Sequence, residues 1–239
     1  MEQQRLDKIL ASTGKWSRKE ARDLIRAGRV LANGVPVRDP SARLDPEGVE
    51  LCADGVPVAV RRVTWVMLNK PAGYLSATED RRAPTVLDLL PPELRNLFPV
   101  GRLDKDTVGL LLLTNDGALA HALLSPRRHV EKVYEARVTG RLTGEDVTAF
   151  REGVTLGDGL RCLPAGLEIL SAGDAESLCR VTVREGKFHQ VRRMLARRGK
   201  TVLTLERVKM GNLPLDPSLK RGSFRFLTEE EVENLRIFL

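Results

Sequence analysis

The chain has 239 residues, 42% of them apolar, with 39 Lys or Arg against 32 Asp or Glu and a formal charge of +7. This size allows one larger domain beside a small one, and the positive charge favours a polyanionic partner. No apolar run reaches about 18 residues, the polar start is unlike a signal peptide, and the three scattered cysteines fit neither a zinc site nor a disulfide framework. We therefore expect a cytoplasmic protein that contacts no membrane.

The first part of the chain, residues 5–55, predicts a compact unit of two helices and a hairpin. Ser17 and Glu20 have the spacing of a capping box at the start of the second helix, and Gly28 ends it. Asn33-Gly34 lies between two apolar runs, which is a strong signal for a tight hairpin. The apolar stripes of the two helices are formed by Leu6, Ile9, Leu10, Ala21, Leu24 and Ile25.

Basic side chains are frequent on these two helices, and acidic ones are fewer. From charge alone, a groove for RNA and an ordinary solvated helix face remain equally good interpretations. The residues that we take as RNA contacts in this unit are Lys15, Arg18, Lys19, Arg22 and Arg26.

The composition changes after the hairpin, so we divide the chain into residues 1–58 and 59–239. Strand-like and helix-like runs alternate irregularly in the second part, which predicts an α+β domain with a mostly antiparallel mixed sheet flanked by helices. The strand-like runs are 65–68, 109–113, 133–138, 178–183 and 202–205, and the helix-like runs are 118–124 and 188–197.

The positive charge is concentrated between Arg184 and Lys209. This segment contains nine Lys or Arg residues and two Glu residues, which gives it a net charge of +7. This segment is a candidate phosphate-binding surface. It contains the predicted helix 188–197, on which His189 and Arg192 are three residues apart and share a side. We expect the buried face of this helix to consist of Phe188, Val191, Met194 and Leu195.

A candidate catalytic carboxylate lies in the segment 101–109, directly before an apolar strand. Asp104 there follows Arg102, and a cation beside a carboxylate near a low-dielectric wall keeps it ionised. Taken alone, the pattern leaves two alternatives open. Asp104 can be an ordinary turn residue, and Asp106 is an equal candidate.

Several blocks of the sequence resemble known families. Residues 5–34 resemble the αL RNA-binding module of a small-subunit ribosomal protein. Gly101-Arg102-Leu103-Asp104, with Thr107 and Gly109, resembles the signature loop of the bacterial ribosomal RNA pseudouridine synthases. Further blocks agree in the expected order, namely 68–74, 131–134, 185–194 and 205–211.

This resemblance implies an isomerase that converts a uridine of ribosomal RNA to pseudouridine without cofactor or metal. It assigns Asp104 as the essential carboxylate and Arg192 as its basic partner. By the same resemblance, Tyr134 packs against the flipped uracil and Arg102 helps to displace the nucleotide. Lys187, Arg193 and Arg197 are expected to bind RNA, and Lys70-Pro71 is expected to be architectural.

The blocks 125–134 and 228–231 resemble the small-subunit (16S) branch, so we expect a 16S ribosomal RNA target and a monomeric enzyme. Two alternatives remain open. One is a large-subunit (23S) ribosomal RNA pseudouridine synthase, and the other is a non-catalytic RNA-binding protein of ribosome assembly. The sequence does not distinguish free RNA from a ribosome assembly intermediate as substrate.

Overall fold

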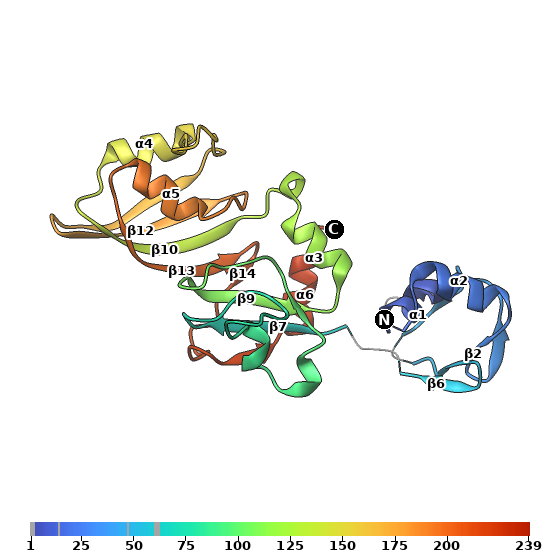
Figure 1. The fold of residues 1–239 in the computed structure, drawn as a ribbon. Helices are drawn as coiled ribbons and strands as arrows, with labels where there is room; N and C mark the ends of the chain where they lie inside the picture. Colours follow the sequence, from blue (N-terminus) through green and yellow to red (C-terminus); the bar gives the residue numbers. More distant parts are fainter. Residues whose placement is uncertain (1–2, 14, 47, 60–62) are drawn as a thin grey trace. The chain divides into compact units, whose positions relative to one another are not determined.

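The computed structural model describes residues 3–13, 15–46, 48–59 and 63–239, and the chain divides into two compact units, Met1–Val63 and Thr64–Leu239 (Figure 1). Among these described residues no helix has the length and apolar content needed to cross a bilayer.

The first unit has the predicted plan of two helices followed by a hairpin. The capping box at the start of α2 is present, with Ser17 and Glu20 bonded to each other's backbone. The apolar stripes of both helices form one buried core with a four-stranded sheet of order β3-β2-β5-β6. The elements are β1 (Gln4–Arg5), α1 (Leu6–Ser12), α2 (Arg18–Arg26), β2 (Val30–Ala32), β3 (Val35–Val37), β4 (Arg43–Leu44), β5 (Leu51–Ala53) and β6 (Val56–Val58).

Two tight turns join the strands of this sheet. Asn33 and Gly34 both have positive φ angles, 49° and 79°, as a two-residue turn between β2 and β3 requires. Asp54 and Gly55 repeat this geometry between β5 and β6, with φ angles of 53° and 77°. The second hairpin was not predicted, although Asp-Gly between apolar residues is the same signal.

The second unit is built on the expected mixed sheet. Its strands follow the order β11-β12-β10-β13-β9-β7-β15, with β14 beside β13 and β8 beside β9. Within the described sheet, β9 and β13 run parallel and the other pairings are antiparallel. The strands are β7 (Trp65–Lys70), β8 (Phe98–Pro99), β9 (Val108–Thr114), β10 (Lys132–Thr139), β11 (Gly166–Ala172), β12 (Glu176–Val183), β13 (Val202–Met210), β14 (Leu213–Pro214) and β15 (Phe224–Phe226).

Helices flank this sheet in two groups. Figure 1 shows α4 and α5 side by side along β10 and β12, and their apolar residues share one buried cluster with those strands. Helices α3 and α6 contribute to a second cluster, with β7 and β9. The bounds are α3 (Gly117–Leu124), α4 (Gly144–Glu152), α5 (Gln190–Arg197) and α6 (Glu229–Arg236), with short 3₁₀ turns at Val86–Leu89, Pro92–Leu94 and Pro126–Arg128.

The start of α5 differs from the prediction. The helix was expected from residue 188, but it begins at Gln190 because His189 adopts a left-handed backbone with φ of 49°. Val191, Met194 and Leu195 are buried as predicted. The placement of Phe188 on the same buried face was wrong, since this side chain lies before the helix and is 73% exposed.

Strand β9 forms the centre of the second unit because both of its faces are buried. Leu110 and Leu112 pack into the cluster of α3 and α6, whereas Leu111 and Leu113 pack into a cluster with the segment that precedes the strand. Alternate side chains of a strand point to opposite faces, so an uninterrupted leucine run suits a strand covered on both sides.

Gly109 is required where β9 meets β13. Its φ is +97°, and a Cβ at this position would lie 2.4 Å from the carbonyl oxygen of Arg207. Any side chain would therefore separate the two parallel strands as well as strain the backbone.

We expect Gly109→Ala to destabilise the second unit by about 3 kcal/mol, through backbone strain and the clash with β13. The matched control is Gly117→Ala at the first position of α3, where φ is not positive and no atom lies within 4 Å of an added Cβ. This control should be neutral or stabilising by up to about 1 kcal/mol. Urea unfolding followed by the fluorescence of Trp65, in a Trp16→Phe background, measures both. Equal stability of the two variants would contradict the argument.

Candidate active site

The loop between β8 and β9 carries Asp104 into a pocket of the second unit. The empty space there, including the open mouth of the pocket, is about 460 Å³. Tyr134 packs against two apolar clusters, the one that contains α4 and α5 and the one that contains Leu111 and Leu113 of β9. The pocket lies where these two clusters meet. Its lining includes the predicted site residues Arg102, Asp104, Tyr134 and Lys187, together with His189 and Leu205.

The backbone of the Asp104 loop is held by a buried ammonium group. Lys70, at the end of β7, is fully buried, and its Nζ lies 2.9–3.3 Å from the carbonyl oxygens of Pro71, Asp104, Lys105 and Thr107. Burial lowers the pKa of Lys70 to about 8, while the carboxylates of Asp106 and Asp104 act in the opposite direction. The loop is thus built around a positive charge.

Two further contacts from the same segment fix this loop. The Ser76 hydroxyl exchanges hydrogen bonds of 3.0 Å with the backbone N–H and C=O of Leu103. The Gly73 amide donates to the carbonyl of Lys105 at 2.8 Å. Residues 70–76 therefore hold the Asp104 loop in place, which agrees with the architectural role expected for Lys70-Pro71.

The Asp104 carboxylate lies near the side chains of His189 and Arg192 but is not bound tightly by either of them. One oxygen lies 3.4 Å from His189 Nε2, and the other lies 3.9 Å from Arg192 Nε. Among the described residues no hydrogen bond to this carboxylate occurs, and the side chain is 30% exposed. The lone pairs of the carboxylate oxygens therefore remain available to a ligand in the pocket.

Arg192 contacts both acids of the loop. Its Nη2 lies 2.9 Å from Asp106 and its buried Nε faces Asp104 without a hydrogen-bond partner in the described part of the chain. Asp106 is 68% exposed and does not line the pocket. The geometry therefore separates the two candidates that the sequence left equal, because Asp104 faces the pocket and Asp106 anchors the arginine from outside.

The floor of the pocket is formed by β10 and β13. Tyr134 pairs with Arg207 across these strands. Arg207 is buried and donates from Nε to the carbonyl of Leu110 at 2.8 Å. Burial, and to a lesser extent the guanidinium of Arg207, lowers the pKa of Lys132 to about 8. Two buried cations therefore lie in the strands that supply Tyr134 and Leu205 to the pocket, and the sequence analysis recorded them only as parts of motifs.

The predicted RNA contacts in this unit differ in availability. Arg102 is exposed at the pocket and forms no ion pair or hydrogen bond with the described residues. Arg193 pairs with Asp158 at 2.5 Å, and Arg197 donates a hydrogen bond to the carbonyl of Thr155 at 3.2 Å. Neither arginine lines the pocket. Lys187 lines it and forms an ion pair with Glu185.

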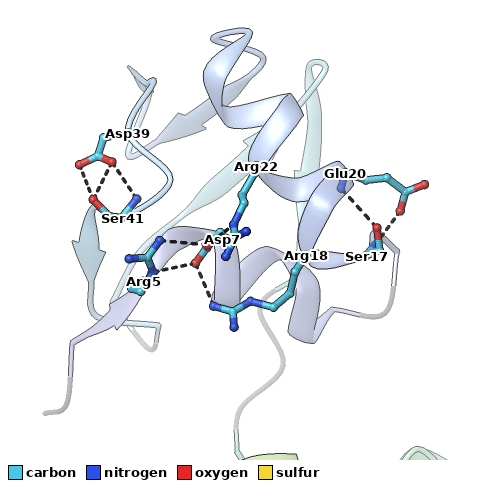
Figure 2. Close-up of polar contacts among 8 residues, drawn as sticks. All are labelled: Arg5, Asp7, Ser17, Arg18, Glu20, Arg22, Asp39 and Ser41. Carbon is cyan, nitrogen blue, oxygen red and sulfur yellow. Dashed lines mark hydrogen bonds and ion pairs between the residues drawn. The ribbon is translucent and has the colours of Figure 1, made fainter.

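The first unit has a basic surface of its own, arranged around one buried acid (Figure 2). The Asp7 side chain is fully buried and pairs with Arg5, Arg18 and Arg22 at 2.9–3.3 Å. Burial alone would raise the pKa of Asp7, but the hydrogen bonds from Arg5 and Arg22 and the charge of Arg18 hold it well below the usual range.

This cluster divides the basic residues predicted to bind RNA into two kinds. Arg18 and Arg22 are held by Asp7, with about half of each side chain exposed. The others, Lys15, Lys19 and Arg26, are exposed and form no ion pair with the described residues. Three arginines around one carboxylate leave a net positive charge in fixed positions, which suits phosphate binding.

Comparison with known proteins gives a consistent result. A family model described as RNA pseudouridylate synthase matches residues 64–197, and one described as S4 domain matches residues 4–50. An uncharacterised RNA pseudouridine synthase of Bacillus subtilis, YtzG, is 46% identical over 97% of this chain and 98% of its own. Ribosomal small subunit pseudouridine synthase A of Escherichia coli K12 is 39% identical over 97% of this chain and 99% of its own. A crystal structure of a pseudouridylate synthase superposes with a TM-score of 0.69 at 36% identity, covering 97% and 99% of the two chains.

We expect Lys70→Met to loosen the Asp104 loop, because four backbone carbonyls lose their common donor. Amide hydrogen exchange at residues 103–107 should accelerate by at least about tenfold relative to the unchanged chain. Lys220→Met, at an exposed lysine, is the control and should leave this exchange unchanged. Equal exchange in the two variants would show that Lys70 does not hold the loop.

We expect the first unit to lose stability in acid through Asp7. Because its folded pKa is depressed, Asp7 contributes stability that is present above pH about 4 and is lost as the pH falls through the folded pKa. Asp7→Asn should cost about 2–3 kcal/mol at neutral pH and remove this part of the acid dependence. Denaturant unfolding followed by Trp16 fluorescence, in a Trp65→Phe background, measures it. Asp23→Asn, at an exposed position, serves as the control. If the free energy of unfolding falls with pH in the same way in the unchanged protein, in Asp7→Asn and in Asp23→Asn, the assignment to Asp7 is refuted.

Proposed function

The chain belongs to the RNA pseudouridylate synthase family and is an isomerase acting on RNA, and from this premise we propose that it converts a uridine of 16S ribosomal RNA to pseudouridine with Asp104 as the catalytic carboxylate. The proposed setting is the cytoplasm, where bacterial ribosomal RNA is made. One observation carries the assignment of Asp104. Its carboxylate faces the pocket, lies near His189 and Arg192 and accepts no hydrogen bond from the described residues.

The geometry suits a group that must be ionised and reactive at once. A carboxylate bonded to several donors is a poor nucleophile and a weak base, whereas an isolated buried carboxylate takes up a proton. His189 Nε2 and Arg192 Nε lie 3.4 and 3.9 Å from the Asp104 oxygens and leave those oxygens uncovered. The contacts of Lys70 fix the backbone beneath Asp104, so that the side chain meets the substrate in a defined position.

The reaction breaks the bond between uracil N1 and ribose C1′, rotates the base and forms a bond from uracil C5 to C1′. The proton on C5 leaves and N1 gains one, so that no atom is added to or lost from the nucleoside. The ionised Asp104 can serve this sequence in two ways, by attack on C1′ or by removal of the proton from C2′. Both require the same free carboxylate oxygen facing the ribose.

The target uridine must leave its stack before Asp104 can reach the sugar, which costs a few kcal/mol. In the proposal, the unpaired guanidinium of Arg102 occupies the space that the uridine vacates. The Tyr134 ring, on the floor of the pocket, packs against the flipped uracil. Stacking on an aromatic ring offsets part of the cost of unstacking.

The assignment to 16S RNA rests on relatives that carry small-subunit names and match nearly the whole of this chain. In the proposal, the exposed lysines and arginines of the first unit, together with the basic side chains of α5, bind the phosphates of that RNA. A 23S target is the alternative within the same activity.

The proposal is tested with unmodified 16S and 23S ribosomal RNA transcripts that carry tritium at uracil C5. The unchanged enzyme should release tritium from 16S RNA. Asp104→Asn should lower the rate by at least about 1000-fold while RNA affinity stays within about threefold, because this substitution removes the reacting group and leaves the phosphate contacts. Asp106→Asn is the matched control and should retain activity within about tenfold.

Three results would change the proposal. Tritium release from 23S RNA but not from 16S RNA would mean that the target uridine lies in the large-subunit RNA. Loss of activity in Asp106→Asn but not in Asp104→Asn would reverse the assignment of the two acids. Release of tritium by Asp104→Asn at the unchanged rate would remove the catalytic role altogether.

A further inference from the structure

An exposed aromatic side chain lies next to the residues of the catalytic pocket. Phe188 is 73% exposed, the largest exposed fraction among the large apolar side chains of the described chain. Its ring stacks on that of His189, with centroids 3.8 Å apart and planes inclined by 18°. His189 lines the pocket and its Nε2 lies 3.4 Å from Asp104. The two rings thus link the catalytic carboxylate to a flat apolar surface open to solvent.

The loop that presents Phe188 is held in place although the ring is exposed. The buried side chain of Gln190 accepts a hydrogen bond of 3.0 Å from the Lys187 amide and donates one of 2.7 Å to Glu185. His189 adopts a left-handed backbone, which is uncommon for a residue with a side chain and costs free energy. This backbone turns Phe188 away from the core. A fixed, exposed ring loses little entropy when a flat ligand packs on it.

Three cations lie near this ring. Lys187 precedes Phe188, and Arg193 donates from Nη1 to its carbonyl at 3.4 Å. Arg192 lies on the next turn and reaches the catalytic loop. Each of these cations is paired with a carboxylate, namely Glu185, Asp106 or Asp158, so the exposed ring is the group that indicates the ligand. Its flat apolar face matches the face of a nucleotide base.

We propose that Phe188, backed by His189, is the stacking platform for a base that neighbours the target uridine in the RNA. The inference rests on the proposed function, because flipping of one uridine into the pocket disrupts the stack of the adjacent bases, and the guanidinium of Arg102 in the vacated space can cover only one of them. A free face of the Phe188 ring, next to His189 and so next to the pocket, is suited to receive the other base. Phe188 is therefore a substrate-positioning residue that contacts RNA outside the pocket.

The test compares Phe188→Leu with Phe188→Tyr and with Phe226→Leu. The control residue Phe226 is a phenylalanine of the same unit, is 56% exposed and does not line the pocket. Binding of an unmodified 16S transcript is measured over a range of salt concentrations. Phe188→Leu should weaken binding about 10-fold with an unchanged salt slope, because stacking releases no counterions. Phe188→Tyr and Phe226→Leu should bind like the unchanged protein.

Two further measurements make the inference specific. In the tritium assay, Phe188→Leu should raise KM about 10-fold while kcat changes by less than about threefold. With a fully paired RNA duplex as the probe, the effect on binding should vanish, because no base is free to stack. Equal affinity of Phe188→Leu and Phe226→Leu for the 16S transcript, or a loss that is the same for the duplex, would overturn the inference. Failure of the proposed activity appears separately, as absence of tritium release by the unchanged enzyme.

Discussion

The structure of the candidate site depends on one buried charge. The Lys70 ammonium lies where the ends of β7 and the Asp104 loop meet, and its contacts with four backbone carbonyls replace the water that the loop would otherwise need. Such a charge is costly to bury, and the lowered pKa of Lys70 expresses that cost. The contacts of Lys70 hold the loop in a single backbone conformation, and this conformation determines the position of Asp104.

The first unit is also organised by one buried ion, but there the ion is negative. There a buried carboxylate, Asp7, organises exposed arginines, whereas in the second unit a buried ammonium organises a loop that carries an exposed acid. In both cases the buried ion makes the short contacts and the functional group remains partly free. Asp104 and the arginines around Asp7 are thereby positioned by buried groups while their own polar atoms remain partly available to a ligand.

Sequence patterns predicted the parts of this molecule that depend on local chemistry or on a motif. The capping box of α2, the Asn33-Gly34 hairpin and the mostly antiparallel sheet are confirmed. Phe188 was misplaced because an apolar residue beside a helix fits its buried face by periodicity, and the left-handed backbone of His189 is not encoded in periodicity. Lys70-Pro71 was expected to be architectural, but the partners of Lys70 were not predicted, since three of the four carbonyls lie 34 to 37 residues away.

The parallel pairing of β9 with β13 has a consequence for synthesis. The two strands are separated by about ninety residues of chain, and the pocket floor includes Leu205 of β13. A growing chain that has not yet delivered β13 from the ribosome has the Asp104 loop but no floor beneath it. The pocket can therefore be completed only after β13 has been made, and the Asp104 loop waits for that strand during synthesis.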